Sequence, residues 1–285
     1  MKKNLIVSTI AFLVSLSCRM QATDFADVVV DYAPGANSSY TDQNAVLGQP
    51  GGIVGADSGY PNVFSPFSPH YESNAMTGIG YGGQLTLQLQ NYVTIQPGAY
   101  EIGVWSNVGL DDADGNGTAT NPTTTLSTPR SAVVSVSADG TNWVTLNGGS
   151  PIAFSLPGNY YTNAGPYDAA APADPQYANF GQPFTGTLSS FDGEDYSQIL
   201  STLNGSAGGT WLDLDGTGLS EVGYIRFNGV PSGEVLDLNA VSINSTLAGG
   251  IVPEPGAASL LLVGVALTQG FKRRRQVLSP QTSRL

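Results

Sequence analysis

The sequence predicts an all-β protein, an antiparallel, jelly-roll-like β-sandwich with long loops, one short helix and a further hydrophobic helix at the C-terminus. Strand-length apolar runs recur between turns, in a chain with 36 Gly and 18 Pro among its 285 residues. Residues 84–90 alternate polar side chains with leucine, which is the period of a half-buried antiparallel strand. Asp139 and Gly140 separate two strand-like runs, which indicates a β-hairpin.

At least eight strands are expected. The clearest covers residues 84–95, where Leu85, Leu87 and Leu89 should face the core. Gln84, Thr86, Gln88 and Gln90 should then face solvent on the opposite side of the sheet. The other strands are expected at residues 27–32, 100–105, 131–137, 143–146, 210–214, 221–228 and 234–243.

One helix is expected in the middle of the chain, at residues 195–203. Its apolar residues recur at helical spacing, and Gly205 follows its end. The acidic segment 192–195 should cap its N-terminus, where carboxylates are favoured. Residues 151–183 are rich in Pro, Tyr, Asn and Ala, and are expected to form an elaborate surface loop.

The charge distribution excludes several classes of function. The formal charge is −12, but residues 23–252 contain two arginines, Arg130 and Arg226, against 21 acidic residues and no lysine. A nucleic-acid partner is not expected, because this region has no basic face to neutralise phosphates. Cys18 is the only cysteine and His70 the only histidine. A disulfide framework, a Cys/His zinc site and a Cys–His dyad are therefore excluded.

The first 22 residues have the pattern of a secretory signal peptide. Lys2 and Lys3 precede a mostly apolar run at residues 5–16, and Ala22 is a small residue at the expected cleavage edge. The apolar run is too short to span a membrane of about 30 Å, and Leu16 argues against lipoprotein processing at Cys18. We therefore expect export, followed by a β domain at residues 23–250.

The C-terminus has three consecutive parts. Pro253, Glu254 and Pro255 precede a mostly apolar run at residues 256–271, which is followed by the basic cluster Lys272, Arg273, Arg274 and Arg275. The apolar run is short for a stable membrane span. The basic cluster should remain on the cytoplasmic side of the membrane, with residues 276–285 as a short cytoplasmic tail.

This tail resembles a PEP-CTERM sorting signal, the recognition tag of exosortase substrates, over residues 251–275. The resemblance implies transient anchoring in the inner membrane, processing by an exosortase, and release to the cell surface or the extracellular matrix of a biofilm. A plain tail anchor is the alternative. Residues 137–143 and 235–241 also resemble, more weakly, a hairpin and the closing strand of discoidin-like β-sandwiches; Asn239 stands where those strands carry a second acid.

A calcium loop is the sharpest local candidate site. Asp112, Asp114, Asn116 and Gly117 follow the front of the calcium-loop pattern, and alternate oxygen ligands suit Ca²⁺. Asp111 or a distant acid would complete the ligand set. The twelfth position is Thr123 and no helices are expected on either side, so the segment is not an EF-hand. A solvated polar turn is the alternative.

Aromatic residues form the other candidate site. Aromatic faces beside Asn and Asp side chains suit a sugar-binding surface, although the same rings could instead pin the loop to the sandwich. They are Tyr160, Tyr161, Tyr167, Tyr177, Phe180 and Phe184.

The sequence thus predicts an exported, non-catalytic surface or matrix protein, structural or adhesive, with calcium or extracellular polysaccharide as candidate ligands. No catalytic residue is assigned. The alternatives are a carbohydrate-active enzyme that uses two carboxylates, and a lectin-like module with one defined glycan. The many acidic residues make a chance carboxylate pair uninformative.

Overall fold

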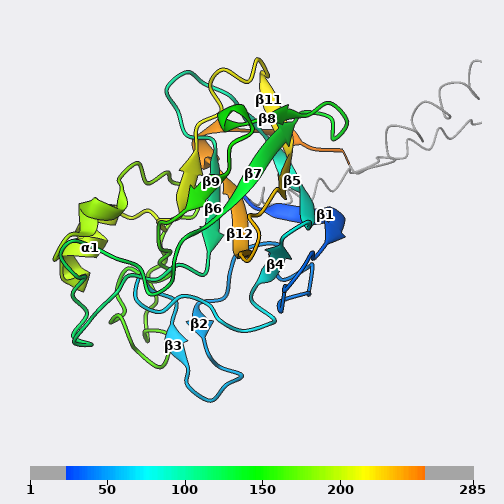
Figure 1. Cartoon of the computed structure of the whole chain (residues 1–285). Coiled ribbons are helices and arrows are strands. Elements are labelled where there is room, and N and C mark those ends of the chain that lie inside the picture. The colour runs from blue at the N-terminus through cyan, green and yellow to red at the C-terminus, as the bar shows by residue number, and fades with distance from the viewer. Residues whose placement is uncertain (1–23, 254–285) are drawn as a thin grey trace, which may run out of the picture.

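The computed structural model describes residues 24–253, and the chain is mostly β, with antiparallel pairing throughout its named strands (Figure 1). The expected signal peptide, the membrane helix and the sorting residues Glu254, Pro255 and Lys272 to Arg275 lie outside this range. Within residues 24–253, no helix is both long and apolar enough to cross a membrane. The expectation of an all-β chain with antiparallel sheets and one short α-helix is confirmed.

The larger sheet has seven strands. Its main order is β1 (Ala26–Ala33), β5 (Gln84–Thr94), β11 (Glu221–Asn228), β7 (Arg130–Ser137) and β8 (Val144–Thr145). Two further strands join it: β13 (Ala248–Ile251) pairs with β5, and β9 (Ile152–Phe154) pairs with β7. The β-pairing therefore continues to residue 251, one residue past the expected end of the domain.

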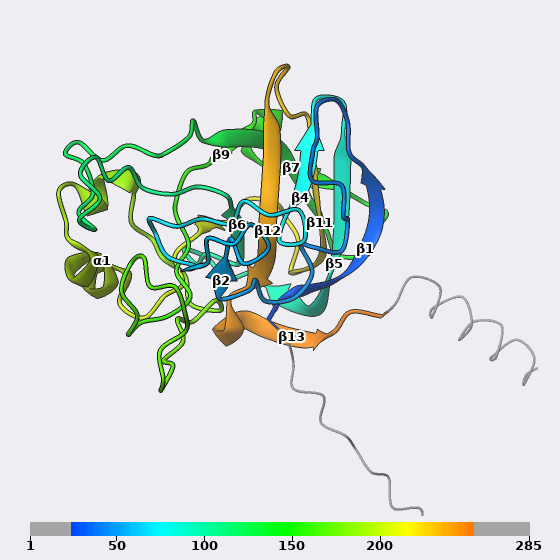
Figure 2. The same cartoon turned by 90° about the horizontal axis from the view of Figure 1, so that it is seen from below.

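The second sheet has four strands in the order β10 (Thr210–Leu212), β6 (Ile102–Ser106), β12 (Val235–Ile243) and β4 (Thr77–Gly80). A separate two-stranded ribbon joins β2 (Ile53–Val54) to β3 (Asn62–Val63). Short 3-10 helices occur at η1 (Asn147–Gly149), η2 (Leu188–Phe191) and η3 (Ser245–Leu247). Figure 2 shows α1 (Tyr196–Leu203) and the connections around it on the side of the molecule away from β1.

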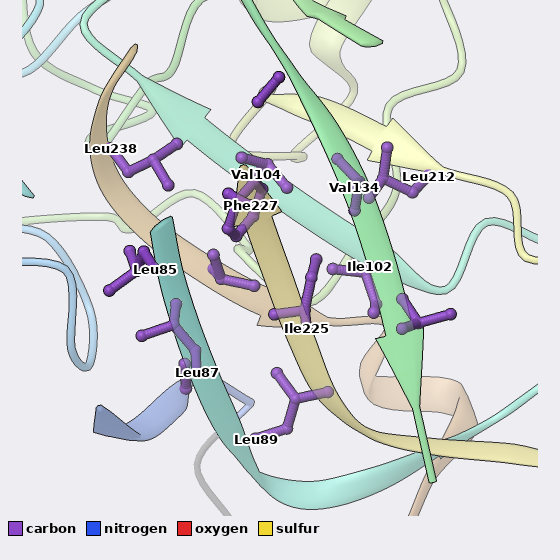
Figure 3. Packing of buried hydrophobic residues seen from close by; sticks show 14 of the residues in the cluster. Leu85, Leu87, Leu89, Ile102, Val104, Val134, Leu212, Ile225, Phe227 and Leu238 are labelled. Carbon is purple, nitrogen blue, oxygen red and sulfur yellow. The ribbon is translucent and has the colours of Figure 1, made fainter. Parts of the chain in front are cut away.

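The two sheets contribute to one apolar core. Leu85, Leu87 and Leu89 of β5 are fully buried, as the alternation predicts. They belong to the same cluster as Ile102 of β6 and Leu238 of β12, from the other sheet (Figure 3). Burial of large aliphatic side chains contributes roughly 1.5–3 kcal/mol each, so this shared core holds the sheets together.

The middle of the opposite face of β5 is also buried, so the expected exposure was wrong for Thr86 and Gln88, while Gln84 and Gln90 are half-buried. Thr86 and Gln88 are only 1% and 2% exposed. Gln88 Nε2 donates to the carbonyls of Val252 and Pro253, at 3.1 and 3.3 Å. The end of the described chain therefore lies across this face and satisfies a polar side chain that the local pattern assigned to solvent.

The β7–β8 connection also covers the face of the sheet that carries Thr86 and Gln88. Arg226 Nε donates to Thr86 Oγ1 at 3.0 Å, and its guanidinium carbon lies 3.8 Å from the centre of the Trp143 ring. Such a cation–π contact is favourable by about 0.5–1 kcal/mol at exposed sites. One of the two arginines of residues 23–252 is thus held between Thr86 and Trp143.

The predicted hairpin between β7 and β8 forms, with Val136 opposite Val144. Its connection is wider than a two-residue Asp-Gly turn, because Asp139 organises the loop with its side chain. Asp139 Oδ1 accepts hydrogen bonds from the Asn142 and Thr141 amides, both at 2.8 Å. These bonds hold the pKa of Asp139 well below its ordinary value.

The predicted helix forms as α1, and Asp195 caps it. Asp195 Oδ1 accepts from Gln198 N at 3.0 Å, and Gln198 Oε1 accepts from Asp195 N at 2.8 Å, which makes a capping box. Asp192 does not cap this helix: its Oδ1 accepts from Thr123 N at 2.7 Å instead. The acidic segment therefore fixes two different connections.

Residues 151–183 are not purely a surface loop. They include β9, and several of their side chains enter a second apolar cluster around Trp105 together with α1. Trp105 Nε1 donates to the Ala207 carbonyl at 3.0 Å. This cluster is the support on which the candidate site is built.

Candidate binding site

An open hollow of about 350 Å³ lies where the start of the described chain meets residues 177–181. Its lining combines aromatic rings with polar side chains. The residues are Asp24, Phe25, Gln49, Tyr160, Tyr177, Ala178, Asn179, Phe180 and Gly181. We refer to it as the aromatic pocket. Three of the six aromatic residues singled out from the sequence, Tyr160, Tyr177 and Phe180, line it.

The rings of the aromatic pocket are tied to one another and to the core. Phe180 is buried and packs on Trp105, with ring centres 5.0 Å apart. Tyr160 contacts Phe180 at 5.9 Å and Tyr177 at 5.7 Å, in both cases close to edge-to-face. Aromatic pairs favour this geometry. Tyr177 is nevertheless 59% exposed, so its ring presents free apolar surface beside the pocket.

Main-chain hydrogen bonds fix the segment that carries these side chains. Ala178 N donates to the Tyr160 carbonyl at 2.8 Å, and Asn179 N donates to the Gly205 carbonyl at 2.8 Å. The Phe180 carbonyl accepts from Ser242 Oγ at 2.6 Å. Since these bonds connect the segment to three separate parts of the chain, the pocket is formed before any ligand arrives.

The polar groups of the aromatic pocket are carboxyl and amide. Asn179 Oδ1 accepts from Gly181 N at 2.9 Å, which orients the side chain. Partial burial raises the pKa of Asp24 above its ordinary value. No lysine or arginine is among the lining residues. The pocket therefore offers stacking surface together with groups that exchange hydrogen bonds with hydroxyls.

The other three predicted aromatic residues have different surroundings. Phe184 stacks on Phe191, with ring centres 5.4 Å apart and planes at 21°. Tyr161 is buried and packs against Tyr160 at 4.8 Å. Tyr167 donates its hydroxyl to Asp112 Oδ2. These three rings pin the long connection to the domain, which is the alternative that the sequence left open.

A second hollow of about 360 Å³ lies beside the β1–β2 connection and has no aromatic lining residue other than His70. We refer to it as the polar pocket. Its polar residues are Asn44, Gln49, Asp57, His70, Glu72 and Asn74. Gln49 also lines the aromatic pocket. Glu72 Oε1 accepts from Asp57 N at 2.7 Å and Ser58 N at 3.1 Å, which holds the rim of the polar pocket.

His70 is an uncharged part of the polar pocket wall. It is 2% exposed, packs on Phe64 at 4.6 Å, and its Nε2 lies 3.0 Å from the Gly51 carbonyl. Because a carbonyl only accepts, Nε2 carries the proton, and Nδ1 is buried without a hydrogen-bond partner among residues 24–253. Burial lowers the pKa of His70 to about 4, and the bond to Gly51 offsets this only in part.

The predicted calcium loop closes on itself. Asp112 Oδ1 accepts from Gly115 N at 3.0 Å and Asn116 N at 3.3 Å, and its Oδ2 accepts from Gly117 N at 2.7 Å. Asp114 Oδ2 accepts from Asn116 Nδ2 at 2.8 Å. Asp112, Asp114 and Asn116 are therefore brought together by hydrogen bonds that the loop itself provides.

Asp111 points elsewhere, because its Oδ2 accepts from Thr124 Oγ1 at 3.1 Å. In residues 24–253, no three or more His, Cys, Asp or Glu side chains are arranged to hold a metal ion. Calcium binding at Asp111, Asp112, Asp114 and Asn116 stays a prediction, and the observed bonds are those of a self-capped polar turn.

Asp112→Ala is expected to lower the free energy of unfolding by about 1–2 kcal/mol, since it removes the acceptor for three backbone amides and for Tyr167. Partial burial raises the pKa of Asp112, but the bonds from Tyr167 and the amides outweigh it and hold the pKa below its ordinary value. Urea unfolding at neutral pH measures the loss.

Asp114→Ala is the matched control for this loop, and it should cost less because Asp114 accepts from the Asn116 side chain rather than from the backbone. Both variants should behave the same with and without Ca²⁺ if the loop is a self-capped turn. A rise in melting temperature with Ca²⁺ in the parent chain, lost equally in both variants, would establish the calcium loop instead.

No protein-family model matches this sequence, and no curated protein matches it either. The chemistry of the two pockets is therefore the basis for assigning a function.

Proposed function

We propose that this chain is an exported, non-catalytic glycan-binding protein of the cell surface or biofilm matrix, with a jelly-roll-like β-sandwich as its binding domain. The single observation that carries the binding role is the exposed Tyr177 ring beside Asp24, Gln49 and Asn179. The core shared by the two sheets supports the sandwich.

The chemistry of a sugar ring matches this surface. A pyranose has faces of C–H groups, which pack on an aromatic ring, and a rim of hydroxyls, which both donate and accept hydrogen bonds. Tyr177 supplies the aromatic ring. Asn179 and Gln49 supply side-chain amides, each of which carries a hydrogen-bond donor and an acceptor. Because Asn179 is oriented by Gly181 and Tyr160 by its packing on Phe180, little ordering is needed on binding.

Tyr177→Ala is expected to weaken binding of a soluble polysaccharide at least tenfold, because the stacking surface is lost while the floor at Phe180 remains. Affinity electrophoresis against a polysaccharide panel, followed by calorimetry on the best ligand, measures the change. Tyr81→Ala is the matched control: its side chain is 57% exposed, similar to that of Tyr177, but it does not line the pocket. Equal effects of the two substitutions would contradict the proposal.

A carbohydrate-active enzyme is the alternative, and the polar pocket contains two carboxyl groups, those of Asp57 and Glu72. Both are engaged in the structure of the rim: Asp57 Oδ2 accepts from Asn74 Nδ2 at 2.6 Å, and Glu72 accepts from two backbone amides. A reducing-end assay on the same panel separates the two functions. Turnover that disappears in Glu72→Gln would favour the enzyme.

Sorting by an exosortase is the second part of the proposal, and it rests on the tail at residues 251–275. Its supports are the Pro253-Glu254-Pro255 motif, the apolar run and the basic cluster. In a host with an exosortase, the parent chain should lose its tail and reach the surface or medium. A chain with Pro253→Ala and Glu254→Ala should stay in the inner-membrane fraction. Release of both at the same rate would contradict sorting.

A further inference from the structure

We propose that the aromatic pocket and the polar pocket are adjoining subsites of one groove that binds a neutral glycan of at least two sugar units. This inference rests on the proposed glycan-binding function and adds the length and charge class of its ligand. The observation that joins the two hollows is Gln49, a residue that lines both.

The boundary between the subsites is anchored on both sides of Gln49. On one side, Gly48 N donates to the Ala26 carbonyl at 3.0 Å, and Gly48 adopts a φ of +74°, which favours glycine. On the other side, the Gly51 carbonyl is held by His70 Nε2 at 3.0 Å. Gln49 itself is exposed. Its amide is therefore carried on a fixed backbone and can contact sugar units in both hollows.

The two hollows offer different but complementary chemistry. The aromatic pocket presents the Tyr177 ring, which suits stacking. The polar pocket presents the side chains of Asn44, Asn74 and Glu72, which suit hydrogen bonding to hydroxyls. At about 350 and 360 Å³, each is near the lower end of the range of about 300–1,000 Å³ for small-molecule pockets. One sugar ring in each hollow is consistent with these sizes.

The charge of the groove selects against acidic glycans. Asp24, Asp57 and Glu72 are the acidic lining residues, and no lysine or arginine is among the residues that line either hollow. His70 is neutral at neutral pH, because burial lowers its pKa to about 4. A uronic acid unit would therefore meet like charge without a compensating cation. A neutral polymer avoids this repulsion.

Calorimetry on the secreted chain tests the groove with four series of neutral sugars, built from glucose, galactose, mannose and N-acetylglucosamine, each of one to four units. Oligogalacturonates of the same lengths, which carry a carboxylate on every unit, are the acidic control series. We expect at least one neutral series to bind, with affinity rising at least tenfold between one and two units. The acidic series should bind more weakly than the best neutral series at every length.

Substitutions then assign the subsites. Tyr177→Ala should weaken binding of both the one-unit and the two-unit ligand. Asn74→Ala should leave the one-unit affinity unchanged and reduce the two-unit affinity toward it. Because Asn74 also bonds Asp57, Asn44→Ala, on another part of the same pocket, provides a second variant. Melting curves check that all three variants fold.

The outcomes distinguish failure of the two-subsite groove from failure of the proposed glycan-binding function. Absence of binding to every sugar would overturn both proposals. Binding that is independent of length and insensitive to Asn74→Ala and Asn44→Ala would overturn the groove and leave a single glycan site at Tyr177. Tighter binding of the oligogalacturonates would overturn the neutral class of ligand.

Discussion

Trp105→Ala is expected to lower the free energy of unfolding by about 3–5 kcal/mol, the range for removing a buried aromatic side chain. Trp105 is fully buried and packs edge-to-face against Trp211, with ring centres 5.8 Å apart and planes at 82°. The substitution also removes the indole N–H that pairs with the Ala207 carbonyl. An unpaired buried carbonyl adds to the cost.

The backbone around Trp105 leaves little room for relaxation. A Cβ on Gly103, Gly158 or Gly209 would lie 2.6 to 2.8 Å from atoms of the indole. Main chain rather than flexible side chain therefore lines much of the cavity that alanine would leave, and such a cavity collapses poorly. The loss should also weaken the proposed glycan binding, because Phe180 rests on the Trp105 ring.

Urea unfolding followed by circular dichroism measures this loss. Trp143→Ala is the matched control, because it also removes a tryptophan but one that is only partly buried and stacks on Arg226. Its expected cost is about 1 kcal/mol. Equal losses for the two variants would show that the cluster around Trp105 does not contribute the packing assigned to it.

His70 is expected to make the protein less stable as the pH falls from about 6.5 to about 4. Its pKa in the folded chain is about 4, against about 6.5 in an unfolded chain. Between these values the unfolded chain binds the extra proton, so the contribution of His70 is complete above pH 6.5 and is lost as the pH falls toward 4. The span corresponds to about 3 kcal/mol.

His70→Gln tests this contribution, because glutamine keeps an N–H for the Gly51 carbonyl but does not titrate. Unfolding free energies at half-unit steps from pH 4 to 7 should show a steeper loss in the parent chain than in the variant. Parallel curves would mean that His70 has the same pKa in the folded and unfolded chains, and would contradict the lowered pKa.

The contribution of Asp237 to the pH dependence of stability must be measured separately, because its sign is opposite to that of His70. Burial raises the pKa of Asp237 to about 6, and Arg130 counteracts this only in part. Its contribution is therefore present at low pH and is lost as the pH rises from about 4 to about 6. Asp237→Asn should be more stable than the parent chain at pH 7, by about 1–2 kcal/mol after allowance for its partial exposure. The two variants together resolve the opposing slopes.

The strong local patterns predicted the centre of each sheet. Residues 221–228 were expected as a strand and form β11 with the same bounds, and the three leucines of β5 enter the core. The strand β4, Thr77–Gly80, was missed because two of its four residues are glycine and it has no polar alternation. Gly80 is required there because a Cβ would collide with the main chain of Ala36, 2.8 Å from its carbonyl carbon. Such a requirement is imposed by residues far away in the sequence, so it leaves no local pattern around the strand.

The same limit explains which face of β5 was misjudged. Gln88 is polar and alternates with leucine, so the local pattern assigned it to solvent. Its burial depends on the carbonyls of Val252 and Pro253, more than 160 residues later in the chain. The short strands β2, β9 and β13 have too few residues to show an alternation of polar and apolar side chains.

The candidate site was predicted in part. The cluster of tyrosines at residues 160–177 and Phe180 indicated a binding surface from composition alone, and Tyr160, Tyr177 and Phe180 do line one pocket. Asp24 and Gln49 were missed, because each is a single polar residue in a connection, brought to the pocket by the fold. As the single histidine, His70 served only to exclude a Cys/His zinc site and a Cys–His dyad, and nothing in its sequence neighbours indicates the wall it forms.

The position of Arg226 has a consequence for the resistance of the domain to proteases. Trypsin-like proteases cut after lysine or arginine, and residues 23–252 offer them only the bonds after Arg130 and Arg226. Both residues lie within strands of the seven-stranded sheet, and the guanidinium of Arg226 is stacked on Trp143. A protease needs an extended, accessible segment, so cleavage at these bonds must wait until the sheet opens. The lifetime of the domain in trypsin therefore reports how often β7 or β11 opens.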